Sequence, residues 1–227
     1  MRNFTITPES WPVDGEFIIS KGACTTAEIV VVEIAEDGVI GRGECERTDT
    51  FEPGYPDVVA AIEAARAAVE AGVDREELQS LMPSGSARNA IDCALWDLAA
   101  KRAGSPAWKL AGVEEPEPCL TVLTISLGTP EVMARDAARA ADREILKLKL
   151  GGEGDIERVK AVRAAVPKMR LTVDANEAWT PEMLPRYLDA LAPLCIEFVE
   201  QPLPIAEGHH LEGLAHSIPI AADETVR

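Results

Sequence analysis

The sequence lacks both a membrane-spanning apolar run and an excess of positive charge. Among its 227 residues there is no stretch of about 18 consecutive apolar residues, which argues against a spanning helix. Lysine and arginine number 22 against 39 aspartates and glutamates, so the net charge at pH 7 is −17. A surface this acidic repels phosphate. We therefore expect neither a nucleic acid nor a membrane as partner.

The sequence also lacks paired cysteines and a leader-like N-terminus. Its five cysteines are scattered and odd in number, with no Cys-x-x-Cys spacing. The opening residues MRNFTITPESWPVDG contain no central apolar region of the kind found in a secretion signal. We expect free thiols in a reducing cytoplasm. Apolar residues make up 47% of the chain, enough for one large domain or two small ones.

The first half of the chain has strands followed by helices. Residues 27–45 alternate β-branched and polar side chains, and Asp37-Gly38 interrupts them with a hairpin signal. Helical periodicity follows over residues 56–72 and again over 86–104. This order predicts an α+β domain over residues 1–118, which ends at the proline- and glutamate-rich EEPEP.

From residue 119 strands and helices alternate. Helical patterns cover residues 130–142, 155–166 and 181–192. The expected strands are LTVLTISL, EILKLKL, MRLTVD, CIEFVE and IPIAAD. Units of this size imply right-handed parallel crossovers, as in a (β/α) barrel. An open doubly wound sheet is the alternative, but no glycine-rich phosphate turn follows the first strand.

Only five of the eight βα units of a closed barrel are predicted over residues 119–227. A half-closed barrel would leave strand edges exposed, which natural folds avoid. We therefore expect the C-terminal part of the barrel to be missing, so that the chain is part of a longer protein or a truncated product.

Three acidic residues end successive predicted strands. The spacing is 25 residues from Lys149 to Asp174, 26 from there to Glu200 and 23 from there to Asp223. The carboxyl ends of parallel barrel strands converge on one mouth, where the chemistry of that fold occurs. Three carboxylates there are suited to a hard divalent cation. The pattern predicts metal-assisted proton transfer with a lysine as base.

Two lysines lie on the strand before Asp174. Lys147 and Lys149 are two residues apart, so both side chains point to the same side of the strand. Mutual repulsion and burial would lower the pKa of one of them toward neutrality, as a base near physiological pH requires. His209 and His210 match no metal spacing, and we interpret them as surface or structural residues.

The motifs KLKL, DANEAW, EQPLP and ADET, in this order, resemble the enolase superfamily. Within it the muconate-lactonizing subgroup is most similar, and the run from Lys147 to Thr180 most resembles its dipeptide (L-Ala-D/L-Glu) epimerases. The segment ARNAIDCALWDLAAKRAG is similar to the capping domain of that superfamily. The resemblance implies an N-terminal α+β capping domain followed by a TIM-type barrel.

The resemblance also implies roles for individual residues. Asp174, Glu200 and Asp223 match Mg²⁺ ligands, and Lys149 matches the base on one face of the substrate α-carbon. Lys147 matches its companion beside the substrate carboxylate.

Two further residues match positions around this site. Asn176 is similar to a residue that supports the metal ligands, and Thr124 to one that contacts substrate. Two loops, around residues 14–26 and 45–56, are implied to set specificity, and the first has Lys21 where the family pattern has arginine.

The implied reaction is Mg²⁺-dependent epimerisation of a carboxylate substrate, with a dipeptide favoured, through an enediolate intermediate. N-acylamino acid racemase, o-succinylbenzoate synthase and muconate cycloisomerase activities use the same apparatus and stay open. A truncated, non-catalytic fragment also stays open, because the resemblance implies that the second base and the residues that bind the dipeptide ammonium belong to later strands than the five predicted here. The sequence leaves open whether the protein forms a homo-oligomer.

Overall fold

A computed structural model describes residues 2–46 and 57–226 of the chain. Most of the predicted specificity loop 45–56, with the proline that opens the predicted helix 56–72, lies outside the described residues. The chain forms two compact units. The first comprises residues 1–14 and 26–118, and the second residues 15–25 and 119–227. The turn between the first two strands therefore belongs to the second unit.

The sheet of the first unit has three strands in the order β1-β2-β3. They are β1 (Asn3–Ile19), β2 (Gly22–Glu36) and β3 (Val39–Glu46). β2 and β3 pair antiparallel, with Glu36 opposite Val39. Asp37 and Gly38 have φ values of 52° and 80°, as the tight turn of a two-residue hairpin requires. The predicted hairpin is confirmed.

Five helices follow this sheet. They are α1 (Val58–Ala64), α2 (Arg66–Ala71), α3 (Arg75–Leu81), α4 (Ser86–Ala103) and α5 (Ala107–Leu110). The helical pattern predicted over 56–72 is present up to its expected stop at Gly72, but it is divided into two helices, because α1 ends at Ala64 and Ala65 forms a turn before α2. The Ala65 amide there donates to Ile62 O in a tighter i→i+3 turn. The Asp57 side chain caps α1 by accepting from the amides of Val59 and Ala60.

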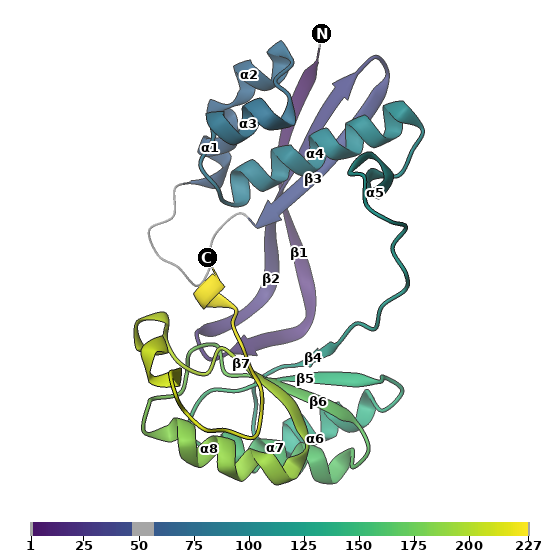
Figure 1. The fold of residues 1–227 in the computed structure, drawn as a ribbon. Helices are drawn as coiled ribbons and strands as arrows, with labels where there is room; N and C mark the ends of the chain where they lie inside the picture. The colour runs from purple at the N-terminus through teal and green to yellow at the C-terminus, as the bar shows by residue number, and fades with distance from the viewer. Residues whose placement is uncertain (1, 47–56, 227) are drawn as a thin grey trace. The chain divides into compact units, whose positions relative to one another are not determined.

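The long helix α4 packs directly on β3, with the strand behind it in Figure 1. Two glycines permit this close approach. A Cβ added at Gly43 would lie 2.0 Å from Ala90 O, and one at Gly41 would lie 2.2 Å from Ala94 O. Apolar side chains of α4, including Ile91, complete the core of this unit.

The second unit contains a five-stranded parallel sheet with the order β4-β5-β6-β7-β8. Its strands are β4 (Leu123–Ile125), β5 (Ile145–Lys149), β6 (Arg170–Asp174), β7 (Ile196–Glu200) and β8 (Ile220–Ala221). Consecutive strands are neighbours, as in part of a (β/α) barrel. The chain thus has the α/β architecture expected, with an α+β capping unit and a partial barrel.

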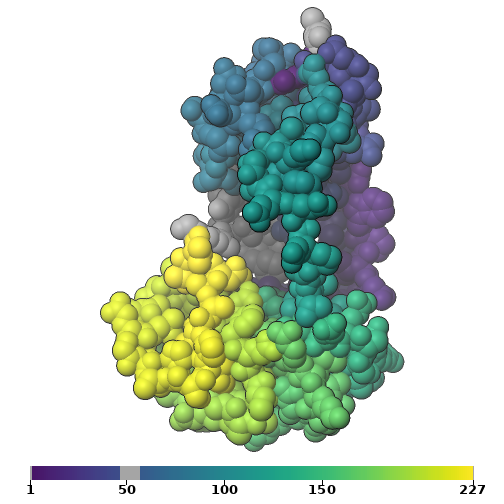
Figure 2. Space-filling model, turned by 45° about the vertical axis from the view of Figure 1, so that its right-hand side comes forward, coloured from purple at the N-terminus to yellow at the C-terminus, as the bar shows by residue number. Residues whose placement is uncertain are grey.

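Helices connect these strands and cover one face of the sheet (Figure 1). They are α6 (Pro130–Arg139), α7 (Asp155–Ala165) and α8 (Met183–Leu191), with the 3₁₀ segments η1 (Ala192–Leu194), η2 (Ile205–Leu211) and η3 (Glu224–Val226). Pro130 occupies the first turn of α6, and the Thr129 side chain caps it. The last described residues lie at the surface of this unit, in yellow in Figure 2. Within the described residues no helix combines the length and apolarity needed to cross a membrane.

The expected buried strand over residues 120–127 is shorter and more exposed than predicted. Only Leu123–Ile125 form β4, and Leu120 and Leu123 are exposed. Among the described residues β4 lies at one edge of the sheet, with a neighbouring strand of that sheet on one side only. The apolar residues of this segment therefore predicted more burial than β4 has in the structure.

Candidate functional site

The strand register brings the sequence-predicted residues to one end of the sheet. Lys149 on β5 is paired with Asp174 on β6, and Asp174 with Glu200 on β7. Paired residues on parallel strands project to the same side of a sheet. Glu200 is in turn paired with Ala221 on β8, two residues before Asp223.

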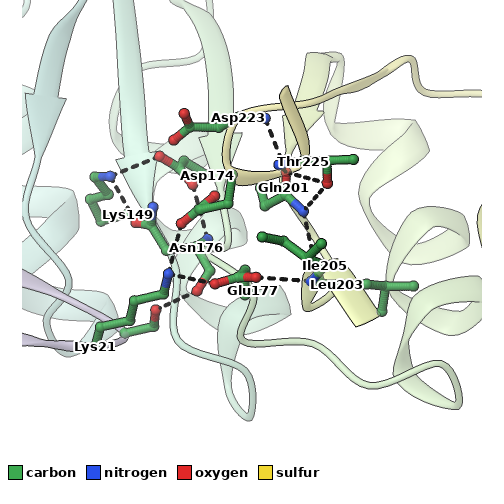
Figure 3. A network of polar contacts seen from close by, with 12 residues as sticks. Lys21, Lys149, Asp174, Asn176, Glu177, Gln201, Leu203, Ile205, Asp223 and Thr225 are labelled. Atoms are coloured by element: carbon green, nitrogen blue, oxygen red, sulfur yellow. Dashed lines mark hydrogen bonds and ion pairs between the residues drawn. The ribbon is translucent and has the colours of Figure 1, made fainter. Parts of the chain in front are cut away.

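Lys149 and Asp174 form a buried ion pair. Lys149 Nζ donates to Asp174 Oδ2 at 2.7 Å and to Asn176 Oδ1 at 2.7 Å (Figure 3). Asp174 is fully buried, and Lys149 is 8% exposed. A buried carboxylate requires partners that offset its loss of hydration, and this lysine supplies one.

Lys147 connects two of the predicted metal ligands. Its Nζ lies 2.9 Å from Asp174 Oδ2 and 2.7 Å from Glu200 Oε1. One cationic group thus contacts both carboxylates at once. Thr124 on β4 is paired with Lys147, so it lies on the same side of the sheet and is half-buried.

The predicted lowering of the pKa of one of the two lysines does not occur at Lys147. Burial by itself would lower the pKa of this group, but hydrogen bonds and charge from Glu200 and Asp174 more than offset burial, and the pKa lies above its ordinary value. The spacing of the two lysines indicates their mutual repulsion but gives no sign of the carboxylates on the neighbouring strands.

Asn176 connects the lysine to the loop after β6. Its backbone amide donates to Asp174 Oδ1 at 2.9 Å, while its side-chain oxygen accepts from Lys149. Asn176 and Glu177 have φ values of 41° and 65°, a region that non-glycine residues rarely adopt. Such conformations often occur at functional sites.

Asp223 lies at the same end of the sheet, and its side chain is exposed. In Figure 3 it extends from its backbone toward the side on which Asp174 lies. Among the described residues the three carboxylates do not form a compact ligand cluster, since such a cluster is found only for Glu207, His209 and His210. The role of Asp223 as a ligand stays a prediction.

The two histidines are exposed on η2, and His210 Nε2 lies 3.2 Å from Glu207 Oε2.

The residues present are suited to a hard divalent cation. Asp174 and Glu200 offer carboxylate oxygens close enough for one ammonium group to contact both. Oxygen ligands of this type are those that Mg²⁺ prefers. The donor set therefore fits the ion implied by the resemblance.

Sequence reasoning did not find the ion-pair cluster around Lys21. Lys21 Nζ lies 2.5 Å from Glu177 Oε2 and 2.9 Å from Glu224 Oε1. Ser20 Oγ next to it donates to Asn176 O at 2.9 Å. These contacts join the segment 15–25 to the loops after β6 and β8. In the sequence Lys21 differs from a family pattern, and no local signal indicates its two partners.

Asp155, the first residue of α7, is a second residue that the sequence did not identify. Its fully buried carboxylate accepts hydrogen bonds from the amides of Gly151 and Gly152, from Trp179 Nε1 and from Arg158. Gly151 and Gly152 follow β5, whereas Trp179 follows β6. Asp155 therefore connects the loops that follow Lys149 and Asp174.

Two family models match almost the whole chain. The mandelate racemase / muconate lactonizing enzyme N-terminal domain matches residues 1–112, and the enolase C-terminal domain-like model matches residues 132–227. The L-Ala-D/L-Glu epimerase of Escherichia coli is 41% identical over 227 residues, covering 99% of this chain and 71% of that protein.

Solved structures give the same picture. An enolase family member from Agrobacterium tumefaciens, with homology to dipeptide epimerases and bound sodium and L-Ala-L-Glu, is 41% identical with a TM-score of 0.94. The alignment covers 100% of this chain and 70% of that one. The dipeptide epimerase of Enterococcus faecalis complexed with Mg and L-Leu-L-Tyr is 30% identical with a TM-score of 0.87, covering 98% and 67%.

Proposed function

The chain belongs to the enolase superfamily, in its mandelate racemase / muconate lactonizing enzyme group, and on this premise we propose that the protein is a Mg²⁺-dependent dipeptide epimerase. In this reaction the configuration at the α-carbon of a carboxylate substrate is inverted, because a proton is removed from one face and a proton is delivered to the opposite face. The enzyme class is an isomerase that acts on amino acid derivatives.

One observation carries the proposal. Lys149 and Lys147 project from the same side of β5 and contact the carboxylates of β6 and β7. We infer that these residues are a base and ligands for a hard cation, and their location at the carboxyl ends of parallel strands, where barrel enzymes carry out their chemistry, supports this. Both are needed, because a proton beside a carboxylate is very weakly acidic: the base accepts the proton, and the cation stabilises the negative charge that remains.

Asp174, Glu200 and Asp223 would hold the metal. When bound, Mg²⁺ neutralises negative charge that builds up on the substrate carboxylate as the α-proton leaves. A lysine base that acts with Mg²⁺ is a general feature of enolase-superfamily sites.

The lysines have separate tasks in the proposed reaction. Lys149 in its neutral form accepts the α-proton on one face of the substrate carbon, and Asn176 Oδ1 keeps its Nζ in place through the 2.7 Å hydrogen bond. Lys147 stays cationic and lies beside the substrate carboxylate, where it offsets negative charge. We propose that Thr124 contacts the substrate, and its pairing with Lys147 across β4 and β5 supports this role.

We propose a dipeptide as the substrate because the three proteins described above are named for a dipeptide or contain one. The Escherichia coli relative is named for L-Ala-D/L-Glu, and the Agrobacterium structure contains L-Ala-L-Glu. L-Ala-L-Glu is therefore the first substrate to test.

All five cysteines are free, which supports the cytoplasm as the location of the protein.

Chiral separation of the products tests the proposal. The intact protein is incubated with L-Ala-L-Glu and Mg²⁺, and the appearance of L-Ala-D-Glu is followed with time. We expect conversion toward a mixture of the two epimers. If neither this dipeptide nor a broad panel of L,L-dipeptides is converted at saturating Mg²⁺, the proposed function is wrong.

A further inference from the structure

A buried glutamine connects the ends of the last two strands. Gln201 follows Glu200 directly at the end of β7 and is 4% exposed. Its φ of 35° lies in the region that non-glycine residues rarely adopt. A residue persists in such a conformation when the surrounding contacts fix it there.

The Gln201 side chain uses both ends of its amide. Its Oε1 accepts from the backbone amides of Asp223 at 3.0 Å and Thr225 at 3.1 Å. Its Nε2 donates to Leu203 O at 2.9 Å and to Thr225 Oγ1 at 2.8 Å (Figure 3). The opposite orientation of the amide would place its NH₂ group against two N–H donors, so these contacts select one orientation.

Strand pairing alone does not hold Asp223. The β7–β8 ladder pairs Val199 with Ile220 and Glu200 with Ala221, so the register pairs end two residues before Asp223. The Gln201 backbone amide donates to Ala221 O at 2.9 Å, and its side chain then accepts from the Asp223 amide. The glutamine therefore continues the connection between the strands up to the residue that the proposed function assigns to the metal.

We propose that Gln201 is a positioning residue that fixes the backbone of Asp223 so that its carboxylate can reach the cation shared with Asp174 and Glu200. This inference rests on the proposed function, because it assumes that Asp223 is a ligand. It requires no direct contact between Gln201 and either metal or substrate. Its effect is therefore expected on metal affinity more than on the proton-transfer step.

Three variants separate positioning from general packing. Gln201→Leu removes the acceptor for the Asp223 amide and the donor to Leu203 O. Gln201→Glu keeps an acceptor for the Asp223 and Thr225 amides and loses the donor. Thr225→Val removes the hydroxyl contacts with Gln201 and leaves the bond to the Asp223 amide in place.

The test is the dissociation constant of Mg²⁺, measured by calorimetry without substrate on proteins whose folding is checked by thermal melting. We expect Gln201→Leu to weaken Mg²⁺ binding by about 10- to 100-fold, the usual effect of losing a hydrogen bond that orients a ligand. Thr225→Val should change the dissociation constant of Mg²⁺ by less than about 3-fold, because the hydrogen bond from the Asp223 amide to Gln201 remains. Gln201→Glu should bind at least as tightly as the wild type.

Two results would overturn the inference. One is a folded Gln201→Leu protein that binds Mg²⁺ as tightly as the wild type. If that variant does not fold, a large loss of affinity in folded Gln201→Glu decides against the inference, because its acceptor is intact. Should the wild-type protein bind Mg²⁺ but epimerise no dipeptide, the proposed function fails while the affinities still decide the role of Gln201.

Discussion

Lys149 Nζ lies 2.7 Å from Asp174 Oδ2, because the two residues are paired across neighbouring parallel strands. The proposed base and a proposed metal ligand are thus held by the sheet itself. Side chains based on strands are positioned more accurately than those on loops. This relationship leads to the first prediction.

Replacing Lys149 by glutamine should abolish epimerisation. The change removes the group that accepts the proton, and a general base contributes about 10²- to 10⁴-fold to a rate. The turnover of L-Ala-L-Glu at saturating Mg²⁺ measures the effect. Lys160→Gln on the exposed surface of α7 is the matched control and should retain activity. A Lys149→Gln protein with more than a tenth of wild-type turnover would contradict the assignment.

Replacing Asp155 by asparagine should lower the free energy of unfolding of the second unit by roughly 3 kcal/mol. The change breaks the ion pair with Arg158, and it turns an NH₂ group toward N–H donors such as the amides of Gly151 and Gly152. The free energy of unfolding in urea measures this. Asp189 on α8 is exposed, so Asp189→Asn should change stability by less than about 0.5 kcal/mol. Equal stability of the two variants would mean that Asp155 does not join the loops as described.

Gly43→Ala should destabilise the capping unit by about 1 to 3 kcal/mol or more. The added methyl group would lie 2.0 Å from Ala90 O and 2.7 Å from the Ala94 amide nitrogen, so α4 must move away from β3. Thermal melting measures the loss. Gly208→Ala is the control, since no atom lies within 4 Å of its added Cβ. A Gly43→Ala melt like that of the wild type would contradict the close packing.

Cys45 should resist alkylation. Burial, reinforced by the charges of Glu44 and Glu46, raises its pKa to about 11, so the reactive thiolate is scarce at pH 8.5. Because the folded pKa lies above its ordinary value of 9.0, the neutral thiol favours folding below pH 9, and this contribution is lost as pH rises toward 11. Mass spectrometry after iodoacetamide treatment should find exposed Cys119 and Cys195 labelled well before Cys45. Equal labelling rates would contradict its burial.

The features that sequence reasoning predicted depend on local pattern. Asp37 and Gly38 readily adopt the positive φ values of a tight hairpin turn. Strand periodicity placed Lys147 and Lys149 on one side of β5. The spacing of Asp174 and Glu200 followed from the length of a βα unit. These predictions required no knowledge of distant contacts.

The features that sequence reasoning missed depend on contacts between residues far apart in the chain. The raised pKa of Lys147 arises from carboxylates 27 and 53 residues away along the chain. The contact of Lys21 with Glu224 spans 203 residues. Gln201 lies within EQPLP, but nothing in that motif indicates that its side chain reaches the amide of Asp223. Such contacts follow from tertiary packing rather than from propensity.

The most direct test of the central claim is exchange of the substrate α-hydrogen with solvent deuterium, followed by proton NMR on the intact protein with L-Ala-L-Glu. We predict loss of the α-proton signal of the glutamate residue with Mg²⁺ present, no loss after chelation of the metal, and no loss with Asp174→Asn. Exchange that proceeds equally without a divalent ion, or an unchanged signal across a panel of dipeptides at saturating Mg²⁺, would contradict the account.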